Sequence, residues 1–503
     1  MTTAAFMRRL RSKKLGFESI IVNCNPETVS ADYDTSDKLY FEPLTLEDVL
    51  SIHDKEKPLG VIAQFGGQTP LNLASDLEKY GVNILGTTPE TIDLAEDRDH
   101  FRAMMDKLGI PMPESGMAVN VDEALEIANR IGYPVMVRPS YVLGGRGMEV
   151  VHDDEMMKVY MSAAVGVTPD RPILIDRFLH HATECEADAI SDGKNCFVPA
   201  VMEHIELAGV HSGDSACILP SMNLTEKQVT TIKDYTKKIA VEMNVCGLMN
   251  MQYAIEDDTV YVLEANPRAS RTVPLVSKVC NINMVQLATQ IITSIADRQA
   301  LPRTRGFTTR LSITTALRKR VFPFNMFQEV DPVLGPEMRS TGEVLGIAPT
   351  FGEAYYKAQE ATQVKLPLGG TVLLSVCDRD KPELLEIAKS FSELGFRILA
   401  TGKSYDMIKD AGITAERINK MYEGRPNITD AIANGDIQLI INTPAGKTSA
   451  NDDSYIRKSA IRHKVPYITT MAAAKASIEG IKSLKANKHF GVKSIQAHHA
   501  DIK

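Results

Sequence analysis

Short apolar runs alternate with amphipathic helical patterns along most of the chain. In the first hundred residues, apolar runs at 19–23, 60–64 and 82–85 are each followed by turn residues, Asn-Pro, Gly-Gly and Gly-Thr. Buried strands that end in such turns are typical of parallel sheets with ligand loops at the strand ends. We therefore predict a Rossmann-like α/β unit in this part of the chain.

The pattern changes near residue 98. It predicts a helix over 98–108, a strand over 133–138, and strand-rich stretches over 173–190 and 248–266. Helices and strands in this mixture indicate a second α/β domain, which we place over 98–295.

The last part of the chain restarts a regular alternation, with a strand over 370–376, a helix over 382–394 and a strand over 397–401. This pattern predicts a separate doubly wound domain over 364–503. The stretch 296–363 is rich in turns but keeps many apolar residues, so we expect a packed connecting region.

Composition excludes several classes of protein. A chain of 503 residues with 44% hydrophobic and 24% charged residues is typical of a globular protein of several domains. The net charge of -8 argues against a nucleic-acid partner. No apolar run is long enough for a membrane span, so we expect no membrane partner and a cytoplasmic location. The basic segment 1–17 is interpreted as the first helix of a domain, not a targeting segment.

The seven cysteines are scattered and form no C-x-x-C pair. This distribution implies neither a zinc site nor a disulfide framework. We expect ordinary thiols in a reducing compartment.

The first candidate site is the glycine-rich stretch from Arg138 to Met148, Arg-Pro-Ser-Tyr-Val-Leu-Gly-Gly-Arg-Gly-Met. Its glycines allow backbone amides to approach a polyphosphate, and Arg138 and Arg146 supply permanent charge. It is not a Walker A loop, because no Gly-Lys-Ser/Thr follows. Taken alone, such a stretch is equally typical of a hairpin turn.

The second candidate site is the segment Glu264-Ala-Asn-Pro-Arg-Ala-Ser-Arg271, which follows an apolar run. On a strand, Glu264 and Asn266 point to the same face, and a hairpin would bring Gln252 beside them. Oxygen ligands at this spacing suit magnesium that bridges ATP phosphates. Arg268 and Arg271 follow where a transferred phosphoryl group needs positive charge. The alternative is an exposed strand end with a solvated ion pair.

The third candidate is the segment from Glu206 to Asp214, Glu-Leu-Ala-Gly-Val-His-Ser-Gly-Asp. It is also typical of a surface loop between strands. Nearby, the apolar strand 175–179 could line an adenine pocket, with Glu184 available to the ribose.

These three segments occur in the order and spacing of an ATP-grasp enzyme. Longer stretches resemble the large subunit of carbamoyl phosphate synthetase, and the resemblance covers nearly the whole chain. The stretches that carry it are Val22-Asn-Cys-Asn-Pro-Glu-Thr-Val-Ser30, Gln64-Phe-Gly-Gly-Gln68, Gly209-Val-His-Ser-Gly-Asp214, Glu264-Ala-Asn-Pro-Arg-Ala-Ser-Arg271 and, over 331–343, Asp-Pro-Val-Leu-Gly-Pro-Glu-Met-Arg-Ser-Thr-Gly-Glu.

A large subunit of this family is normally a tandem of two similar synthetase halves. A regulatory domain after residue 364 likens this chain to the second half, which phosphorylates carbamate with ATP to give carbamoyl phosphate for pyrimidine and arginine biosynthesis. The resemblance implies a pre-ATP-grasp domain over 1–97, an ATP-grasp domain over 98–295 and a methylglyoxal-synthase-like domain over 364–503. It also implies a ligase that is either glutamine-hydrolysing or ammonia-dependent.

The same resemblance assigns residue roles. Two Mg²⁺ or Mn²⁺ ions would be held by Gln252, Glu264 and Asn266, and Arg268 and Arg271 would face the phosphoryl group. The residues expected to contact ATP are Arg138, Arg177, Leu179, Glu184, Gly209, Val210, His211, Ser212, Gln252 and Glu264.

The terminal domain resembles nucleotide-regulated members of its fold. The residues that match their phosphate and ribose pocket are Lys381, Thr401, Ser404, Lys420, Asn442 and Thr443. The alternative is a domain of the same fold that no longer binds an effector.

The chain also departs from the family pattern. It begins inside the helix that follows the family's first strand, so the first domain is expected to lack that strand. The chain carries no first synthetase half and no glutaminase, so we expect both as partners on other chains. Glu206 and Asp214 match acids used for ornithine activation in some members, but the segment 318–320 is basic where a further acid is expected.

Two rival interpretations remain. The chain could be a non-catalytic, nucleotide-binding regulatory subunit or a truncated fragment of the large subunit. Another ATP-grasp ligase, such as a biotin carboxylase, is disfavoured by the terminal domain and by the absence of a biotin-carrier segment.

Overall fold

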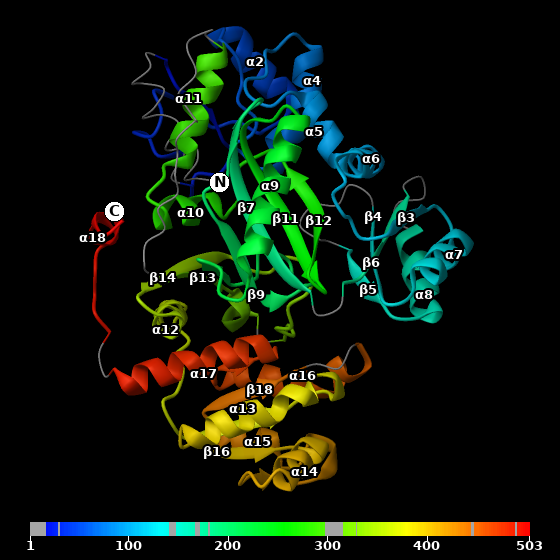
Figure 1. Cartoon of the computed structure of the whole chain (residues 1–503), viewed down its shortest axis with the longest axis vertical. Coiled ribbons are helices and arrows are strands. Elements are labelled where there is room, and N and C mark those ends of the chain that lie inside the picture. Colours follow the sequence, from blue (N-terminus) through cyan, green and yellow to red (C-terminus); the bar gives the residue numbers. More distant parts are fainter. Residues whose placement is uncertain are drawn as a thin grey trace.

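The computed structural model describes residues 17–28, 31–139, 147–165, 172–179, 182–296, 315–327, 329–443, 447–487 and 490–502. The basic segment up to residue 16 and the glycine-rich loop 140–146 lie outside these ranges. Four sheets follow one another through the described residues. The N-terminal unit, the large sheet and the terminal domain are arranged along the long axis, and a smaller sheet projects to the side (Figure 1).

The N-terminal unit differs in part from the expected sheet. β1 (Ile20–Val22) pairs in parallel with β2 (Lys38–Tyr40). The segments predicted as strands at 60–64 and 82–85 make only one parallel bridge, Val61 with Ile84. Among the described residues neither segment has a second strand neighbour, and an isolated parallel pair is the weaker pairing. The helices here are α2 (Leu46–Glu56), α3 (Gln68–Asn72), α4 (Ala74–Lys79) and α5 (Pro89–Glu96).

The predicted helix over 98–108 is confirmed as α6 (Arg98–Leu108). The side chain of Asp97 accepts hydrogen bonds from the first turn, and Gly109 ends the helix in the left-handed conformation. A four-stranded antiparallel sheet follows, with the order β3 (Ser115–Ala118), β6 (Ile173–Arg177), β4 (Val135–Pro139) and β5 (Glu149–Val151). It packs against α7 (Val121–Ile131) and α8 (Asp154–Val165).

The large antiparallel sheet is the centre of the molecule. It has the order β12 (Thr259–Asn266), β11 (Cys246–Glu256), β7 (Thr183–Asp192), β9 (Val201–Leu207), β10 (Cys217–Leu219), β13 (Thr315–Val321) and β14 (Gly342–Ala348), with β8 (Cys196–Phe197) beside β7. One face packs against α6 and α9 (Glu226–Glu242). On the other face, α10 (Val273–Val279) and α11 (Met284–Ala296) cover one end only, and polar side chains occupy the rest.

The stretch expected to be a packed connecting region supplies two strands of this sheet. β13 and β14 pair along seven residues each. α12 (Phe351–Ala361) then packs on their outer side and leads into the terminal domain.

The terminal domain has a five-stranded parallel sheet, as its doubly wound pattern predicts. Its strands, in order, are β17 (Glu416–Arg417), β16 (Arg397–Ala400), β15 (Thr371–Ser375), β18 (Leu439–Asn442) and β19 (Tyr467–Ile468). Val372 and Leu374 pack on one face, and Leu373 packs on the other, so both faces are covered. Its helices are α13 (Lys381–Glu393), α14 (Gly402–Asp410), α15 (Ile428–Ala433), α16 (Lys447–Arg462) and α17 (Met471–Ala486). The last helix, α18 (Ile495–Ala500), lies outside this domain at the level of α10 (Figure 1), where His499 Nε2 is 2.6 Å from the Lys278 carbonyl oxygen.

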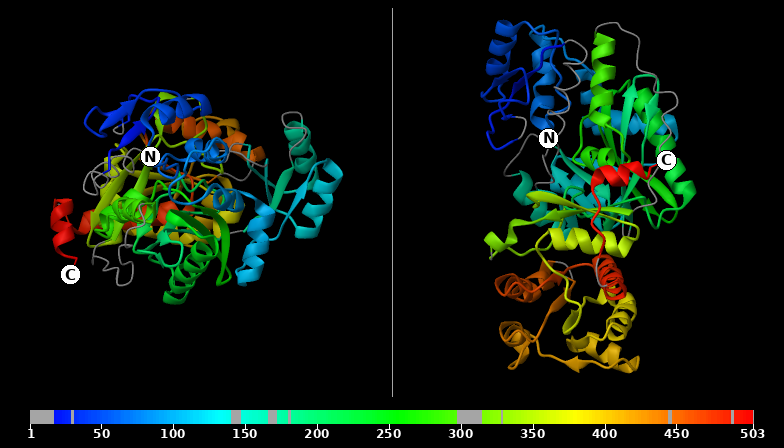
Figure 2. Two further views of the ribbon diagram at one scale, coloured as in Figure 1. Left: turned by 90° about the horizontal axis from the view of Figure 1, so that it is seen from above. Right: turned by 90° about the vertical axis from the view of Figure 1, so that its left-hand side faces the viewer.

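The terminal domain meets the rest of the chain where α17 crosses α12 (Figures 1 and 2). A Cβ added at Gly352 would lie 2.2 Å from Ser483 Oγ and 2.3 Å from the Glu479 carbonyl oxygen. The helices therefore approach so closely at Gly352 that no side chain fits between them.

We predict that Gly352→Ala lowers the free energy of unfolding by about 1–3 kcal/mol, because the added methyl group overpacks this crossing. Gly369→Ala is the matched control, since a Cβ at Gly369 meets nothing within 4 Å; it should change stability by less than about 0.5 kcal/mol. Thermal unfolding of both variants checks this. Equal stability of the two variants would contradict the close approach.

Candidate functional site

One face of the large sheet carries a row of polar side chains that extends from the edge strand β12 to β13. Residues at alternate positions of a strand share a face, and cross-strand neighbours extend the row. The members, strand by strand, are Glu264 and Asn266 on β12, Asn250 and Gln252 on β11, Glu184, Glu186 and Asp188 on β7, His204 and Glu206 on β9, Cys217 on β10, and Arg318 and Arg320 on β13.

The residues expected to bind metal lie together at the open end of the β11–β12 hairpin, away from the turn at Asp257-Asp258. Gln252 is directly opposite Glu264 in the strand register. Asn266 Nδ2 donates a hydrogen bond of 2.9 Å to Glu264 Oε1, and Gln252 Nε2 donates one of 3.0 Å to Ser212 Oγ. No described residue donates a hydrogen bond to Glu264 Oε2 or Gln252 Oε1, so these two oxygens fit the ligand set of a hard cation.

This set contains a single carboxylate. In the described part of the chain no three His, Cys, Asp or Glu side chains gather as metal ligands. A magnesium ion at the hairpin would therefore complete its coordination with amide oxygens, nucleotide phosphates and water, as this ion commonly does.

Both arginines expected to face the phosphoryl group follow directly after β12. Arg268 Nη2 donates to Asn266 Oδ1 at 3.2 Å, so Arg268 adjoins the oxygen ligands. Burial lowers the pKa of Arg271, while the carboxylates of Glu343 and Asp214 oppose that shift. Arg268 therefore supplies positive charge beside Asn266, whereas Arg271 Nη1 donates to Met338 Sδ at 2.7 Å.

The loop from Gly209 to Asp214 covers the row. Its first amide, of Gly209, donates to Glu184 Oε1 at 3.2 Å, and Ser212 accepts from Gln252 as described above. Burial lowers the pKa of His211, against the opposing charges of Asp214 and Glu264, which favours a neutral ring. Val210, His211 and Ser212, which are expected to contact ATP, thus lie on a loop that is hydrogen-bonded to the hairpin.

The remaining residues expected to contact ATP lie where the smaller sheet faces the large one. Arg138 Nε is 3.6 Å from Asp176 Oδ2, and Arg177 donates to Glu256 Oε2 at 2.6 Å. Leu179, which follows β6, is buried in an apolar cluster with Ala254 of β11 and with Tyr261 and Leu263 of β12. Arg177 and Leu179 therefore lie at the junction of the two sheets, and Arg138 lies on the smaller sheet beside Asp176.

The sequence analysis missed several buried groups of the row. Asp188 Oδ1 accepts from Asn250 Nδ2 at 3.0 Å and from Ser270 Oγ at 2.7 Å, and Glu186 accepts from Thr272 at 3.1 Å. These bonds hold the turn that carries Arg271. The signal that could have revealed them is acids at alternate positions in Thr-Glu-Cys-Glu-Ala-Asp-Ala, residues 183–189.

Two more missed groups, His204 and Arg318, lie deeper in the row. His204 Nδ1 is 3.4 Å from Glu184 Oε2, and Nε2 is 3.6 Å from Glu186 Oε1. Burial opposes the charged form of His204, but Cys217 and the two glutamates raise its pKa well above the usual value. Arg318 donates to Cys217 Sγ at 2.7 Å and is fully buried. Charges of both signs therefore compensate one another beneath the loop.

The two acids expected to matter for ornithine, Glu206 and Asp214, accept hydrogen bonds from main-chain amides. Glu206 accepts from the Ala216 amide at 2.6 Å, and Asp214 accepts from the amides of Arg339 and Ser340 at 2.7 and 2.9 Å. The neighbouring Lys319 ammonium lies over the ring of Tyr355, 4.6 Å from its centroid.

The expected effector residues lie at one edge of the terminal sheet. Carboxyl ends of parallel strands meet at a common edge, where Thr401 follows β16 and Asn442 ends β18. Thr401 donates to Ser375 Oγ at 3.0 Å, and Thr443 Oγ1 accepts from the Cys377 amide at 3.1 Å. The others expected here follow these strands along the chain, namely Lys381 at the start of α13, Ser404 in α14 and Lys420 after β17.

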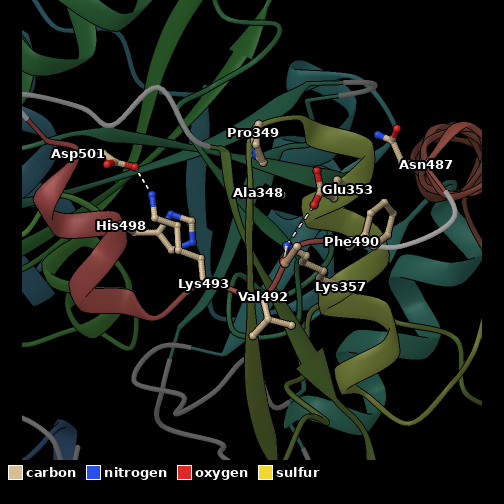
Figure 3. Close-up of a pocket in the computed structure, with 11 residues that line it drawn as sticks. Ala348, Pro349, Glu353, Lys357, Asn487, Phe490, Val492, Lys493, His498 and Asp501 are labelled. Atoms are coloured by element: carbon tan, nitrogen blue, oxygen red, sulfur yellow. Dashed lines mark hydrogen bonds and ion pairs between the residues drawn. The ribbon is translucent and has the colours of Figure 1, made fainter.

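A pocket of about 510 Å³ lies elsewhere, between α12 and the C-terminal segment (Figure 3). Its charged residues are paired, Lys493 with Asp501 and Lys357 with Glu353. It contains none of the residues expected to bind ATP, metal or effector, so it is separate from both candidate sites.

No helix in the described ranges has both the length and the apolar character to cross a membrane.

The fold and the site define an ATP-grasp protein with a pre-ATP-grasp unit before it and a methylglyoxal-synthase-like domain after it. Family models match all three parts: the carbamoyl phosphate synthase preATP-grasp domain over 3–94, the carbamoyl-phosphate synthase L chain ATP binding domain over 97–299, and the MGS-like domain over 383–469. The chain belongs to the carbamoyl phosphate synthase large-chain family.

Relatives in this family align over nearly the whole chain. The carbamoyl phosphate synthase large chain, C-terminal section, of Aquifex aeolicus is 51% identical over 495 residues, which cover 96% of this chain and 92% of the relative. The carbamoyl phosphate synthase large chain of Archaeoglobus fulgidus is 53% identical over 491 residues, which cover 97% of this chain but 45% of the relative. The chain thus spans about half the length of a whole large chain.

Solved structures with the same fold are more distant in sequence. The biotin carboxylase domain of Hydrogenobacter thermophilus 2-oxoglutarate carboxylase superimposes with a TM-score of 0.58 at 17% identity, over 71% of this chain and 87% of that one. N5-carboxyaminoimidazole ribonucleotide synthetase of Thermus thermophilus gives 0.54 at 14% identity, over 73% and 96%. These likenesses show the fold alone.

Asp188 provides a pH test of the buried row. Burial, and then the charge of Glu186, raises the pKa of Asp188 to about 6. The folded protein therefore retains a proton that the unfolded chain loses near pH ~3.9. The stability that comes from tighter binding of this proton in the folded state is fully present below that pH. It is lost as the pH rises to about 6.

We predict that the free energy of unfolding of the ligand-free protein falls, relative to that of Asp188→Asn, by about 3 kcal/mol between those two pH values. Urea unfolding of both proteins across this range measures the difference. Parallel pH profiles would show that Asp188 titrates normally.

Proposed function

We propose that this chain phosphorylates carbamate with ATP and so forms carbamoyl phosphate and ADP. The observation that supports this most is the joint position of Gln252, Glu264 and Asn266 at one end of the β11–β12 hairpin, with Arg268 hydrogen-bonded to Asn266. Arg271 follows three residues further along the chain. Membership of the carbamoyl phosphate synthase family supports the choice of substrate.

In this reaction an oxygen of carbamate attacks the γ-phosphorus of ATP, and the bond from that phosphorus to the bridging oxygen of ADP breaks. Such transfer depends on positioning and on neutralisation of charge. Arg268 and Arg271 would offset the charge on the transferred group. Magnesium, held by Gln252, Glu264 and Asn266, would supply further neutralisation of the phosphates; a magnesium salt of ADP is named in the related biotin carboxylase domain.

Nucleotide binding would use residues of the smaller sheet and of the large sheet. The guanidinium groups of Arg138 and Arg177 would neutralise phosphates, and the apolar cluster around Leu179 would receive the adenine. Glu184 would accept a hydrogen bond from the ribose. The loop from Gly209 to Ser212 would cover the nucleotide and reduce the access of water to carbamate and its phosphate, which both decompose in water.

Other chains would supply carbamate. Several relatives are named as the C-terminal section of a large chain, so we infer that a separate N-terminal section activates bicarbonate. A glutaminase subunit would deliver ammonia, and the product would feed pyrimidine and arginine synthesis in the cytoplasm.

The reverse half-reaction tests the proposal with this chain alone. We predict that the protein forms ATP from carbamoyl phosphate and ADP with Mg²⁺. Glu264→Gln should lower the rate at least ~100-fold, because the carboxylate that would hold Mg²⁺ against the phosphates is lost. Glu242→Gln removes the same charge from the exposed pair with Lys107 and should leave the rate unchanged. Coupled detection of ATP measures all three rates.

A non-catalytic regulatory subunit is the competing function. Binding of ADP without formation of ATP in the unaltered protein would favour that function and exclude ours. If Glu264→Gln formed ATP as fast as the unaltered protein, the hairpin residues would have no part in the reaction.

We also propose that the carboxyl edge of the terminal sheet binds a nucleotide effector through Lys381, Thr401, Ser404, Lys420, Asn442 and Thr443. Hydroxyl, amide and ammonium groups at one sheet edge suit a phosphate and a ribose.

Calorimetric titration with a panel of nucleoside 5′-monophosphates tests this site. We predict saturable binding of at least one of them and a loss of affinity of about tenfold or more in Lys420→Met, because a charge-assisted hydrogen bond to phosphate is removed. Lys409→Met is the control, since Lys409 packs on the ring of Tyr405 within α14. Equal affinity in both variants would exclude the assigned pocket.

A further inference from the structure

A fully buried arginine joins the terminal domain to the rest of the chain. Arg457 lies on α16. This helix is at the side of the terminal domain that faces the large sheet (Figure 1). Its side chain has 0% exposure. Nε and Nη2 donate to the two carboxylate oxygens of Asp331 at 2.7 and 2.5 Å, and Nη1 donates to Asn442 Oδ1 at 2.7 Å. The guanidinium thus links the end of β18 to a residue outside the terminal domain.

Asp331 begins a segment, residues 331–340, that contacts the loop from Gly209 to Asp214. Its carbonyl oxygen accepts from Arg339 Nη1 at 2.8 Å. The amides of Arg339 and Ser340 then donate to the two carboxylate oxygens of Asp214, and Ser340 Oγ donates to the Gly213 carbonyl at 3.1 Å. A continuous series of hydrogen bonds through the segment 331–340 therefore connects Arg457 to the loop.

The loop makes further bonds to the same segment. His211 donates its amide to the Gly335 carbonyl at 2.8 Å, and the Asp214 amide donates to the His211 carbonyl at 2.7 Å. Two carboxylates, Asp331 and Asp214, anchor the two ends of the segment. A shift of the segment would displace the residues that we expect over the nucleotide.

We propose that Arg457 is a positioning residue for nucleotide binding, which acts through Asp331 and Arg339 on the loop from Gly209 to Asp214. It touches neither the nucleotide nor the reacting atoms. The proposal rests on the proposed site, because that site places the loop over ATP. It also makes Asn442 the point at which a ligand of the terminal domain would reach the nucleotide loop.

The placement of this charge distinguishes it from an ordinary surface ion pair. Desolvation of a guanidinium is costly, and the bidentate contact with Asp331 compensates it in a single geometry. An exposed pair bridges the same two elements, since Arg462 on α16 contacts Glu329, and their side chains are 51% and 76% exposed. Exposed pairs of this kind contribute little. The chain therefore offers a matched control for the buried contact.

The test uses the full chain and three variants, Arg457→Met, Asp331→Asn and the double variant. In the assay of ATP formation we expect each single variant to raise the KM for ADP about tenfold while kcat changes less, within the ~5–150-fold range typical of coupled sites. The double variant should resemble either single variant, because all three break one connection. Arg462→Gln with Glu329→Gln should leave the KM within about twofold of the original.

Asp331→Asn keeps the test valid if Arg457→Met fails to fold, since the Asp331 side chain is 29% exposed and its shape is preserved. An unchanged KM in a folded Asp331→Asn protein would overturn the proposal. The same increase in the control pair would overturn it as well, because any domain contact would then suffice.

Calorimetric binding of ADP separates this proposal from the proposed function. If the unaltered protein binds ADP but forms no ATP, and the variants bind ADP about tenfold more weakly, the proposed function fails and the positioning role stands. If the unaltered protein forms ATP and the variants bind ADP equally well, the positioning role alone fails.

Discussion

The burial of charge on one face of the large sheet is the constraint on which the site depends. Ionised groups can leave water only when neighbours of opposite charge or hydrogen-bond donors replace their hydration. Here Glu184, Glu186 and His204 compensate one another, and Arg318 lies across the sheet from them. The strand register keeps these partners within reach. The same register places Gln252 opposite Glu264. The strand pairing that forms the sheet therefore also brings together the two residues that we propose as metal ligands.

The constraint extends beyond the sheet. Asp188 is buried because Asn250 and Ser270 donate to it, and Ser270 in turn caps the turn after Arg271. Asp214 is held by two amides of the segment that begins at Asp331, and Asp331 is held by Arg457. Carboxylates thus hold the turn that carries Arg271, the loop from Gly209 to Asp214 and the contact of the terminal domain with Asp331.

Much of this arrangement could be predicted from the sequence. The hairpin that unites Gln252 and Glu264 follows from two apolar strands joined at Asp257-Asp258, residues that adopt positive φ in the turn. The doubly wound terminal domain follows from its regular alternation. The family resemblance added residues that no pattern separates from ordinary loops, such as those from Gly209 to Ser212.

Other features could not be predicted, for physical reasons. Acids at alternate positions of β7 have the pattern of a solvated strand face. They are buried by groups distant in sequence, the loop at Gly209 and the turn from Ser270 to Thr272. Arg457 lies on a polar helix beside Lys458, where periodicity predicts exposure; its burial depends on a residue 126 positions away. The segments 60–64 and 82–85, expected to be strands, form only one bridge. A local apolar pattern predicts a strand but does not show whether a second strand lies beside it.

A crystal structure of the chain grown with ADP and Mg²⁺ tests the central claim most directly. The account predicts a magnesium ion at about 2.0–2.1 Å from oxygens of Glu264 and Gln252, with the diphosphate beside Arg268. A diphosphate bound without any contact to the β11–β12 hairpin would contradict it.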